Sequence, residues 1–388
     1  MPFYSLCFQN RNLPMYKLLA VFAVSLVLAY LSEQNTKAIL SSGRHYSVWN
    51  DWAYLLLVTV LVLFAGLRTG YNDTWNYMNG FRNSNGLEAF LLEPKNLNIF
   101  RNPLFYFCHS ALRDVTGNAQ WLIFISAAIT QVCFLRFFKR YSHNFTFTIF
   151  IFFTLGTINV SLAALKQMLA MAIATLAFPY LERKQWLIYY VIIFIAMLIH
   201  TYALAFGVLP FFRQRPWTYF TYLFVLALVV LMLNFKEAIS AFMDQADELG
   251  KTLYEEEIFD ENTVNILRVA VYAVAPIVSF FFAHWIFRGS NSMDHTLVHM
   301  SIISFAFMVM GTQSGANMFA RMAHYFELAT ACCLPWMLKQ TFEKKSYRLV
   351  SIVAALCFLG YFVYANAINM RFDEAYKAGS IFTLLGIG

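Results

Sequence analysis

The chain has 388 residues, of which 60% are hydrophobic and 13% are charged, with 28 Lys and Arg against 21 Asp and Glu. A soluble domain of this length carries about a quarter charged residues. The deficit excludes a water-soluble enzyme and predicts an all-α fold, a polytopic integral membrane helix bundle that forms one domain over residues 1–388.

Apolar stretches follow one another along the whole chain. A membrane-spanning helix needs ~20 mostly apolar residues, and the stretches together predict about 10–12 transmembrane helices. Polar residues interrupt two shorter segments, 100–112 and 185–212, so we predict re-entrant or short helical segments there. The clear stretches are 15–31, 50–67, 119–138, 145–158, 160–181, 217–234, 264–287, 296–311, 318–338 and 348–368.

Basic residues gather in short loops, which predicts that these loops are cytoplasmic. All the clusters fall on one side if 185–212 is a hairpin of two short helices with His200 at its outer tip. The same arrangement places the turn Gly311–Asn317 outside. The clusters are Arg136/Lys139/Arg140, Arg183/Lys184, Arg213/Arg215, Arg288 and Lys339/Lys344/Lys345/Arg348.

The net charge of +7 combines two unlike parts of the chain. Residues 236–261 hold nine acidic residues and two lysines, a net charge of −7, whereas the rest of the chain carries +14. The basic clusters place this acidic loop, 235–263, on the extracytoplasmic side. We predict either a solvated, partly helical hairpin or a lid that repels anionic headgroups.

The side of the loop 68–99 is not decided by charge. Basic residues flank the first apolar stretch at both ends, so the positive-inside rule does not orient it. If 100–112 is re-entrant, the loop and the N-terminus are outside. If 100–112 spans the membrane, both are inside.

Ionisable side chains near the middle of a span cost ~2.5–3.5 kcal/mol, so those present are candidates for function. Lys166, Arg268 and Arg321 lie near the predicted outer starts of three helices, where the helix macrodipole disfavours a cation and favours an anion. With Arg68, they predict a binding site for a phosphate or diphosphate. Alternatively, each cation extends separately to lipid headgroups.

Three more residues have both a structural and a functional interpretation. Asp73 either caps the helix that follows or deprotonates a sugar hydroxyl. His200 is either a structural hydrogen-bonding residue or the base, and as base we favour it slightly over Asp73. Tyr325 either donates to the same anion as Arg321 or packs in the core. Glu327 needs a partner that the sequence does not identify.

Six cysteines show no Cys-x-x-Cys spacing, and no Asp-x-Asp motif occurs among the outer candidate residues. Paired thiols or carboxylates at such spacings are what a zinc or divalent-cation site requires. We therefore predict neither a metal nor another cofactor.

With these residues in view, the sequence resembles the EpsG-like branch of the Wzy-type bacterial polysaccharide polymerases, which make O-antigen or exopolysaccharide. The resemblance covers residues from about 60 to about 330, and Lys166 departs from the usual Arg. The motifs are Gly66-Leu67-Arg68 followed by Gly70, Asp73, Tyr77 and Phe81, then Lys166-Gln167 with Ala170, His200 to Ala203, and Arg321 to Tyr325.

The resemblance implies a polymerase that joins undecaprenyl-diphosphate-linked oligosaccharide repeat units at the outer face of the bacterial inner membrane. It also implies that the loop 68–99 faces outward, which favours the re-entrant interpretation of 100–112. The basic residues would stabilise the leaving diphosphate. The implied partners are the lipid-linked oligosaccharide, membrane lipids, a chain-length regulator and a flippase, without nucleic acid.

Two other functions stay open at this point. A flippase or transporter of the same lipid-linked oligosaccharide would also need cations, but should show inverted repeats and a charged path across the midplane. A membrane acyltransferase that modifies a glycan should carry a deep or cytoplasmic histidine as base, and His200 is predicted at an outer tip.

Overall fold

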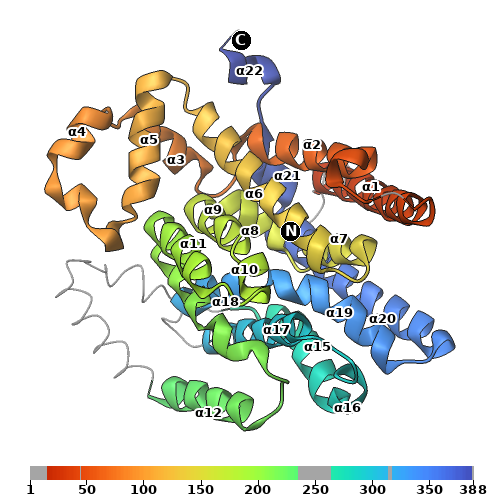
Figure 1. The fold of residues 1–388 in the computed structure, drawn as a ribbon. Coiled ribbons are helices and arrows are strands. Elements are labelled where there is room, and N and C mark those ends of the chain that lie inside the picture. Colours follow the sequence, from red (N-terminus) through yellow and green to blue (C-terminus); the bar gives the residue numbers. More distant parts are fainter. Residues whose placement is uncertain (1–14, 44, 235–263, 313–316, 387–388) are drawn as a thin grey trace, which may run out of the picture.

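The computed structural model describes residues 15–43, 45–234, 264–312 and 317–386, and nearly every element in them is a helix (Figure 1). One short antiparallel pair joins β1 (Arg68–Gly70) to β2 (Lys377–Ala378). The all-α prediction is confirmed. The acidic loop 235–263 lies outside the described residues.

The described helices follow the apolar stretches but are more numerous and shorter. They are α1 (Tyr16–Ser41), η1 (Val48–Asn50), α2 (Trp52–Gly66), α3 (Thr74–Arg82), α4 (Leu87–Leu92), η2 (Pro94–Leu97), η3 (Ile99–Arg101), α5 (Pro103–Val115), α6 (Gln120–Tyr141), α7 (Phe145–Thr154), α8 (Thr157–Ala163), α9 (Leu165–Thr175), α10 (Phe178–Glu182), α11 (Trp186–Ile199), η4 (Thr201–Arg213), α12 (Tyr219–Leu233), α15 (Ile266–Phe281), α16 (Ala283–Ile286), α17 (Ser292–Met310), α18 (Asn317–Phe326), α19 (Leu328–Thr341), α20 (Lys344–Val363), η5 (Tyr364–Asn369), α21 (Phe372–Ala375) and α22 (Ile381–Leu385).

Among the described residues, 4 helices are long and apolar enough to cross a membrane: α1, α6, α17, and α20 continued by η5. The pair α7 and α8, bent by 58°, makes a fifth span if it is counted as one. The helices α2, α11, α12 and α15 are apolar but shorter. The structure therefore confirms a polytopic membrane bundle, with fewer full-length spans than the about 10–12 predicted from apolar length alone.

Backbone geometry explains why several predicted spans are broken. Gly156, with φ +90°, separates α7 from α8, and Ala164, with φ −99° and ψ 69°, separates α8 from α9. The stretch 160–181 is therefore divided among three short helices, and 318–338 is divided at Glu327. Hydropathy detects an apolar stretch but not a turn inside it.

The segment 185–212 is a hairpin of two short helices, as predicted. His200 has extended backbone (φ −153°, ψ 118°) between α11 and η4. The Tyr189 hydroxyl on α11 donates to the Phe206 carbonyl on η4, and the Arg213 guanidinium lies 5.5 Å from the Trp186 ring. The two helices are therefore antiparallel, with His200 at one end and Arg213 at the other.

The segment 100–112 also forms a short helix, α5, of 13 residues. It begins at Pro103, after Asn102 in the left-handed region (φ 55°, ψ 50°). The Asn102 side chain accepts a hydrogen bond of 3.2 Å from the Thr201 backbone N–H. The start of α5 therefore meets the tip of the hairpin, and α5 is too short to span a bilayer.

Basic clusters predicted to be cytoplasmic meet at one end of the bundle. The Glu182 carboxylate accepts from Arg140 at 2.8 Å, and its backbone carbonyl accepts from Arg213 at 3.2 Å. Arg213 also donates to Ser292, at the start of α17, at 3.0 Å. His200, at the far end of its hairpin, lies at the opposite end of the bundle.

A buried ion pair ties together the first long helices. Lys139 on α6 lies 3.2 Å from Asp51, and the exposed fractions of the two side chains are 8% and 0%. Asp51 caps α2 by accepting from the Tyr54 N–H and also accepts from the Ser32 hydroxyl of α1. Each charge is thus compensated in surroundings that solvate ions poorly.

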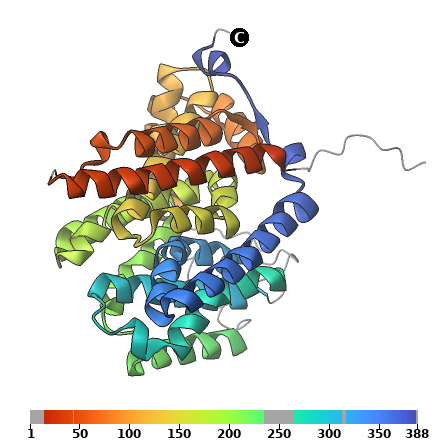
Figure 2. The ribbon, with the colours of Figure 1, turned by 90° about the vertical axis from the view of Figure 1, so that its right-hand side faces the viewer.

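The C-terminal segment holds the other end of these helices. β2 pairs with β1, directly after α2, and the Lys17 ammonium donates to the Asp373 and Tyr376 carbonyls at 3.2 Å each. Figure 2 shows this segment, in dark blue, meeting the start of α1, in red. The Gln120 side chain, on α6, donates to the Arg68 carbonyl at 3.0 Å. These contacts fix the loop that follows α2.

The buried Asp51–Lys139 pair should contribute strongly to stability. Asp51→Ala leaves a buried ammonium without its anion, and we expect a loss of ~3–5 kcal/mol in the free energy of unfolding. Asp51→Asn combined with Lys139→Met should recover much of it. Denaturant unfolding in detergent measures both variants, and Glu374→Ala, at the exposed Arg371–Glu374 pair, is the control. Equal losses from Asp51→Ala and Glu374→Ala would contradict the assignment.

Candidate functional site

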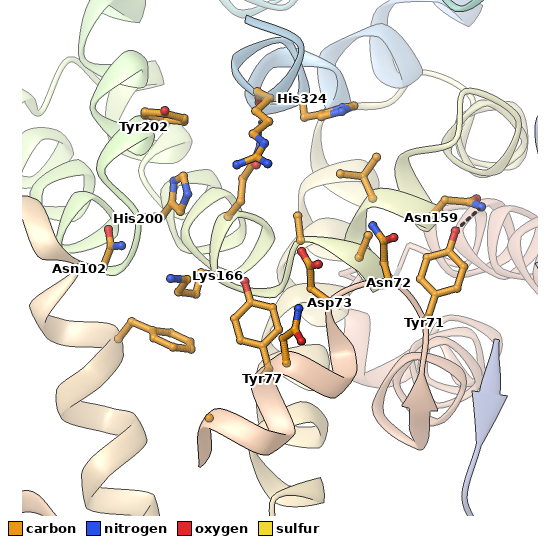
Figure 3. Close-up of a pocket in the computed structure, with 18 of the residues that line it drawn as sticks. Tyr71, Asn72, Asp73, Tyr77, Asn102, Asn159, Lys166, His200, Tyr202 and His324 are labelled. Atoms are coloured by element: carbon orange, nitrogen blue, oxygen red, sulfur yellow. Dashed lines mark hydrogen bonds between the residues drawn. The ribbon is translucent and has the colours of Figure 1, made fainter. Parts of the chain in front are cut away.

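A cavity of about 1340 Å³ opens at the end of the bundle opposite the basic clusters (Figure 3). Its wall combines the loop after α2, α3, α5, the junction of α8 and α9, the hairpin tip, the starts of α15 and α18, and η5. Pockets for drug-sized ligands have volumes of ~300–1,000 Å³. This cavity has room for a larger ligand.

The structure brings most of the predicted site residues together, although they are distant in the sequence. Those that line the cavity are Asp73, Lys166, His200, Arg268 and Arg321. Arg68 and Tyr325 are buried behind the wall, with exposed fractions of 1% and 0%, and they do not line it.

Three cations of the wall lie within the first two turns of helices, as predicted. Lys166 is the second residue of α9, Arg268 the third of α15, and Arg321 the fifth of α18. A cation near a helix N-terminus is unfavourable, and a bound anion compensates both the cation and the helix dipole. The cavity is therefore suited to an anionic group.

The other charges of the wall leave this positive character in place. Arg101, which the sequence analysis did not select, adds a fourth cation. The carboxylates of the wall are Asp73 and Glu93, and Glu93 lies 2.9 Å from the Lys95 ammonium. Cations therefore outnumber carboxylates in the described wall.

Lys166 is held by two aromatic rings of α5. Its ammonium donates to the Tyr106 hydroxyl at 3.2 Å and lies 5.1 Å from the centre of that ring and 5.7 Å from the Phe105 ring. Cation–π contacts of this kind orient an ammonium without neutralising it. Lys166 therefore keeps its positive charge for a ligand.

Asp73 stands at the start of α3, but its side chain makes no capping hydrogen bond. Asp73 thus occupies the N-cap position of the helix 74–82, as the structural interpretation predicted, but its carboxylate does not cap the helix N–H groups. Figure 3 shows it beside Asn72 and near Tyr77 and Lys166. The pKa of Tyr77 is raised to about 12, mainly by burial; the Asp73 carboxylate contributes to this rise, and the Arg321 guanidinium opposes it. Asp73 and Arg321 are thus both within electrostatic reach of the Tyr77 hydroxyl.

His200 reaches the cavity from the tip of the hairpin, and Tyr325 supports it from behind. The Tyr325 hydroxyl lies 2.8 Å from Nδ1 of His200. Tyr325, predicted as a ligand of the anion, is instead a fully buried hydrogen-bonding partner of His200.

Arg68 shapes the loop that carries Asp73. Its guanidinium donates to the Thr74 hydroxyl at 3.2 Å and to the Ala65 carbonyl, and Thr74 donates to the Tyr71 carbonyl at 2.7 Å. Burial lowers the pKa of Arg68 to about 10, so it stays charged at neutral pH. The structure places this arginine, predicted to contact diphosphate, under the loop.

A buried chain of polar groups stands behind Arg268. Its guanidinium donates to Nε2 of His324 at 3.0 Å, and Nδ1 of His324 lies 2.7 Å from Glu327. Glu327 also accepts from the Tyr272 hydroxyl. The partner that Glu327 was expected to need is therefore His324. The sequence did not identify it, although three-residue spacing on a helix places side chains on one face.

Asparagine is frequent in the cavity wall. The Asn159 amide donates to the Tyr71 hydroxyl at 3.1 Å, and to the Asn366 amide oxygen. Amides both donate and accept hydrogen bonds, as sugar hydroxyls do. Asparagines of the wall include Asn72, Asn76, Asn96, Asn102, Asn159 and Asn366.

Two other features that the sequence singled out lie partly within the described residues. Gly311 allows Val264 and Ala320 to pack closely against the backbone, because a Cβ at this position would lie 2.9 Å from Val264 and 3.2 Å from Ala320. Residues 313–316 of the predicted turn lie outside the described residues. No group of three or more His, Cys, Asp or Glu able to hold a metal ion occurs in the described parts of the chain.

Comparison with known proteins assigns the family. The model of the EpsG family matches residues 51–377, a range that holds the loop after α2 and all the cavity cations of the described residues. No match was found among the curated proteins or the solved structures. The chain therefore belongs to the EpsG family, membrane proteins of the polysaccharide-polymerase type.

Proposed function

We propose that the protein is a glycosyltransferase that polymerises oligosaccharide repeat units carried on undecaprenyl diphosphate. The growing chain moves from its lipid diphosphate to a hydroxyl of the next lipid-linked unit, at the outer face of the bacterial inner membrane. One observation carries the proposal: Lys166, Arg268, Arg321, Asp73 and His200 line a single large cavity at one end of the bundle.

The cations are assigned to the diphosphate. When the glycosidic bond to the lipid breaks, negative charge develops on the leaving diphosphate, and preorganised positive groups stabilise it. Lys166, Arg268 and Arg321 supply this charge from three helix starts. Their separate attachment to lipid headgroups is disfavoured, because all three line the same cavity.

Asp73 is assigned as the base that accepts the hydroxyl proton. Among the described residues its carboxylate makes no hydrogen bond or ion pair, so it is available as an acceptor. His200 is the second candidate, since Nδ1 is already engaged by Tyr325. This reverses the slight preference from sequence.

The remaining wall suits the sugars. The volume of about 1340 Å³ exceeds what a diphosphate alone fills. Asparagine amides match hydroxyl groups, and tyrosines such as Tyr77 and Tyr202 provide ring surfaces. A repeat unit of several sugars thus has both polar partners and space.

The alternative functions receive less support. A flippase needs a charged path across the midplane, whereas Lys166, Arg268 and Arg321 share one cavity at one end. An acyltransferase needs a histidine near the cytoplasmic side. His143 lies 3.2 Å from Asp294, but neither lines the cavity. A separate flippase and a chain-length regulator remain proposed partners of the protein.

Loss of a cavity cation should stop chain growth. Purified protein supplied with lipid-linked repeat units should build a ladder of polymers in a buffer containing EDTA, since we predict a metal-independent reaction. We expect Arg321→Ala to lower the rate by ~10²-fold or more, because one donor to the developing charge is lost. Arg183→Ala, at an exposed position distant from the cavity, is the matched control. A full ladder from Arg321→Ala would contradict the site.

The two candidate bases can be separated by substitution. Asp73→Asn keeps the shape but removes the acceptor charge, so chain growth should fall by ~10²–10⁴-fold. His200→Gln should cost less, and Asp73→Glu should retain part of the activity. Initial rates from the same ladder assay measure this. A larger loss from His200→Gln than from Asp73→Asn would assign the proton to His200.

The sidedness of the cavity can be tested by cysteine labelling. In a background with Cys7 and the exposed Cys108 and Cys357 replaced by Ser, Asn83→Cys should react with an impermeant thiol reagent from outside the cell. Ser346→Cys, within the predicted cytoplasmic cluster, should react only after permeabilisation. Labelling in the opposite order would place the cavity on the cytoplasmic side.

A further inference from the structure

At the cavity wall begins a continuous chain of four polar side chains: Arg268, His324, Glu327 and Tyr272. Glu327, Tyr272 and His324 are 0%, 1% and 6% exposed. Arg268 and His324 line the cavity, whereas Glu327 and Tyr272 do not. The chain therefore leads from the wall into the interior.

The direction of the hydrogen bonds follows from the chemistry of the groups. A guanidinium has donors only, so Nε2 of His324 must accept from Arg268. The proton of the neutral imidazole is then on Nδ1, which donates to the Glu327 carboxylate 2.7 Å away. Glu327 fixes this tautomer, because a carboxylate accepts and does not donate.

The arrangement also balances charge. The Glu327 carboxylate is buried, and the Arg268 guanidinium is the cation at the other side of the imidazole. A buried ion without a partner is strongly destabilising. The Glu327 carboxylate and the Arg268 guanidinium therefore compensate each other's charge through the imidazole. Nε of Arg268 is buried and has no hydrogen-bond partner among the described residues.

We propose that His324 and Glu327 are positioning residues that hold the Arg268 guanidinium at the cavity wall for the diphosphate of the substrate. The inference rests on the proposed function, because it takes the diphosphate as the ligand. An arginine whose rotamer is fixed by such partners loses little conformational freedom on binding. The competing role is only to pack α15 against α18.

Binding to the full-length protein in nanodiscs tests the inference. The probe is undecaprenyl diphosphate, and undecaprenyl phosphate is the reference. His324→Leu should weaken diphosphate binding by about tenfold or more, the effect of losing a hydrogen bond to a charged group. His324→Gln retains an acceptor and should recover part of this loss.

A double-mutant cycle separates positioning from packing. In an Arg268→Met background, His324→Leu should cause no further loss of diphosphate binding. An equal loss in both backgrounds, or no loss in the wild-type background, would overturn the inference. If the wild-type protein binds undecaprenyl diphosphate no more tightly than undecaprenyl phosphate, the proposed function is overturned, and the inference with it.

Two further variants keep the test decisive if His324→Leu does not fold. Tyr272→Phe removes only the hydroxyl that donates to Glu327, and it should weaken diphosphate binding several-fold, again only when Arg268 is present. Ser304→Ala, on α17, removes a buried 2.8 Å hydrogen bond to the Ala323 carbonyl of α18, the helix that carries His324. This control should leave diphosphate binding unchanged. A loss from Tyr272→Phe that is independent of Arg268 would contradict positioning.

Discussion

Within a membrane bundle, an ionised side chain is stable only where a second charge, hydrogen-bond donors or water compensate it. This constraint organises the molecule. Asp51 and Lys139 neutralise each other where α1, α2 and α6 meet. Lys166 and Arg321 instead face a cavity of about 1340 Å³, together with Asp73. Buried charges of the described residues thus serve a structural pair in one place and the candidate site in another.

The cavity coincides with interruptions of the helices. Gly156, Ala164, His200 and Asn102 all depart from helical geometry, and all four line it. Irregular backbone at membrane depth is tolerated where it lines a cavity, because water or ligand can satisfy its polar groups. Each interruption also creates a helix start, such as that of α9 at Leu165, beside the site.

These interruptions mark the limit of what the sequence predicts. The hairpin around His200 and the convergence of Lys166, Arg268 and Arg321 follow from charge and hydropathy. The positions of Arg68 and Tyr325 do not, because Arg68 lies in β1, which pairs with β2 about three hundred positions away, and Tyr325 contacts His200. Contacts at such sequence separation have no signal in local periodicity.

The placement of cations at helix starts bears on how the site would discriminate ligands. Each such cation costs ~0.3–1 kcal/mol against the helix dipole while the site is empty. A bound anion offsets this cost, and a diphosphate offsets more of it than a single phosphate does. On the proposed function, the same groups would stabilise the diphosphate most strongly when its bond to the sugar breaks and its negative charge is greatest. An electrostatic arrangement of this kind favours the transition state over the bound substrate, and only such differential binding accelerates the chemical step.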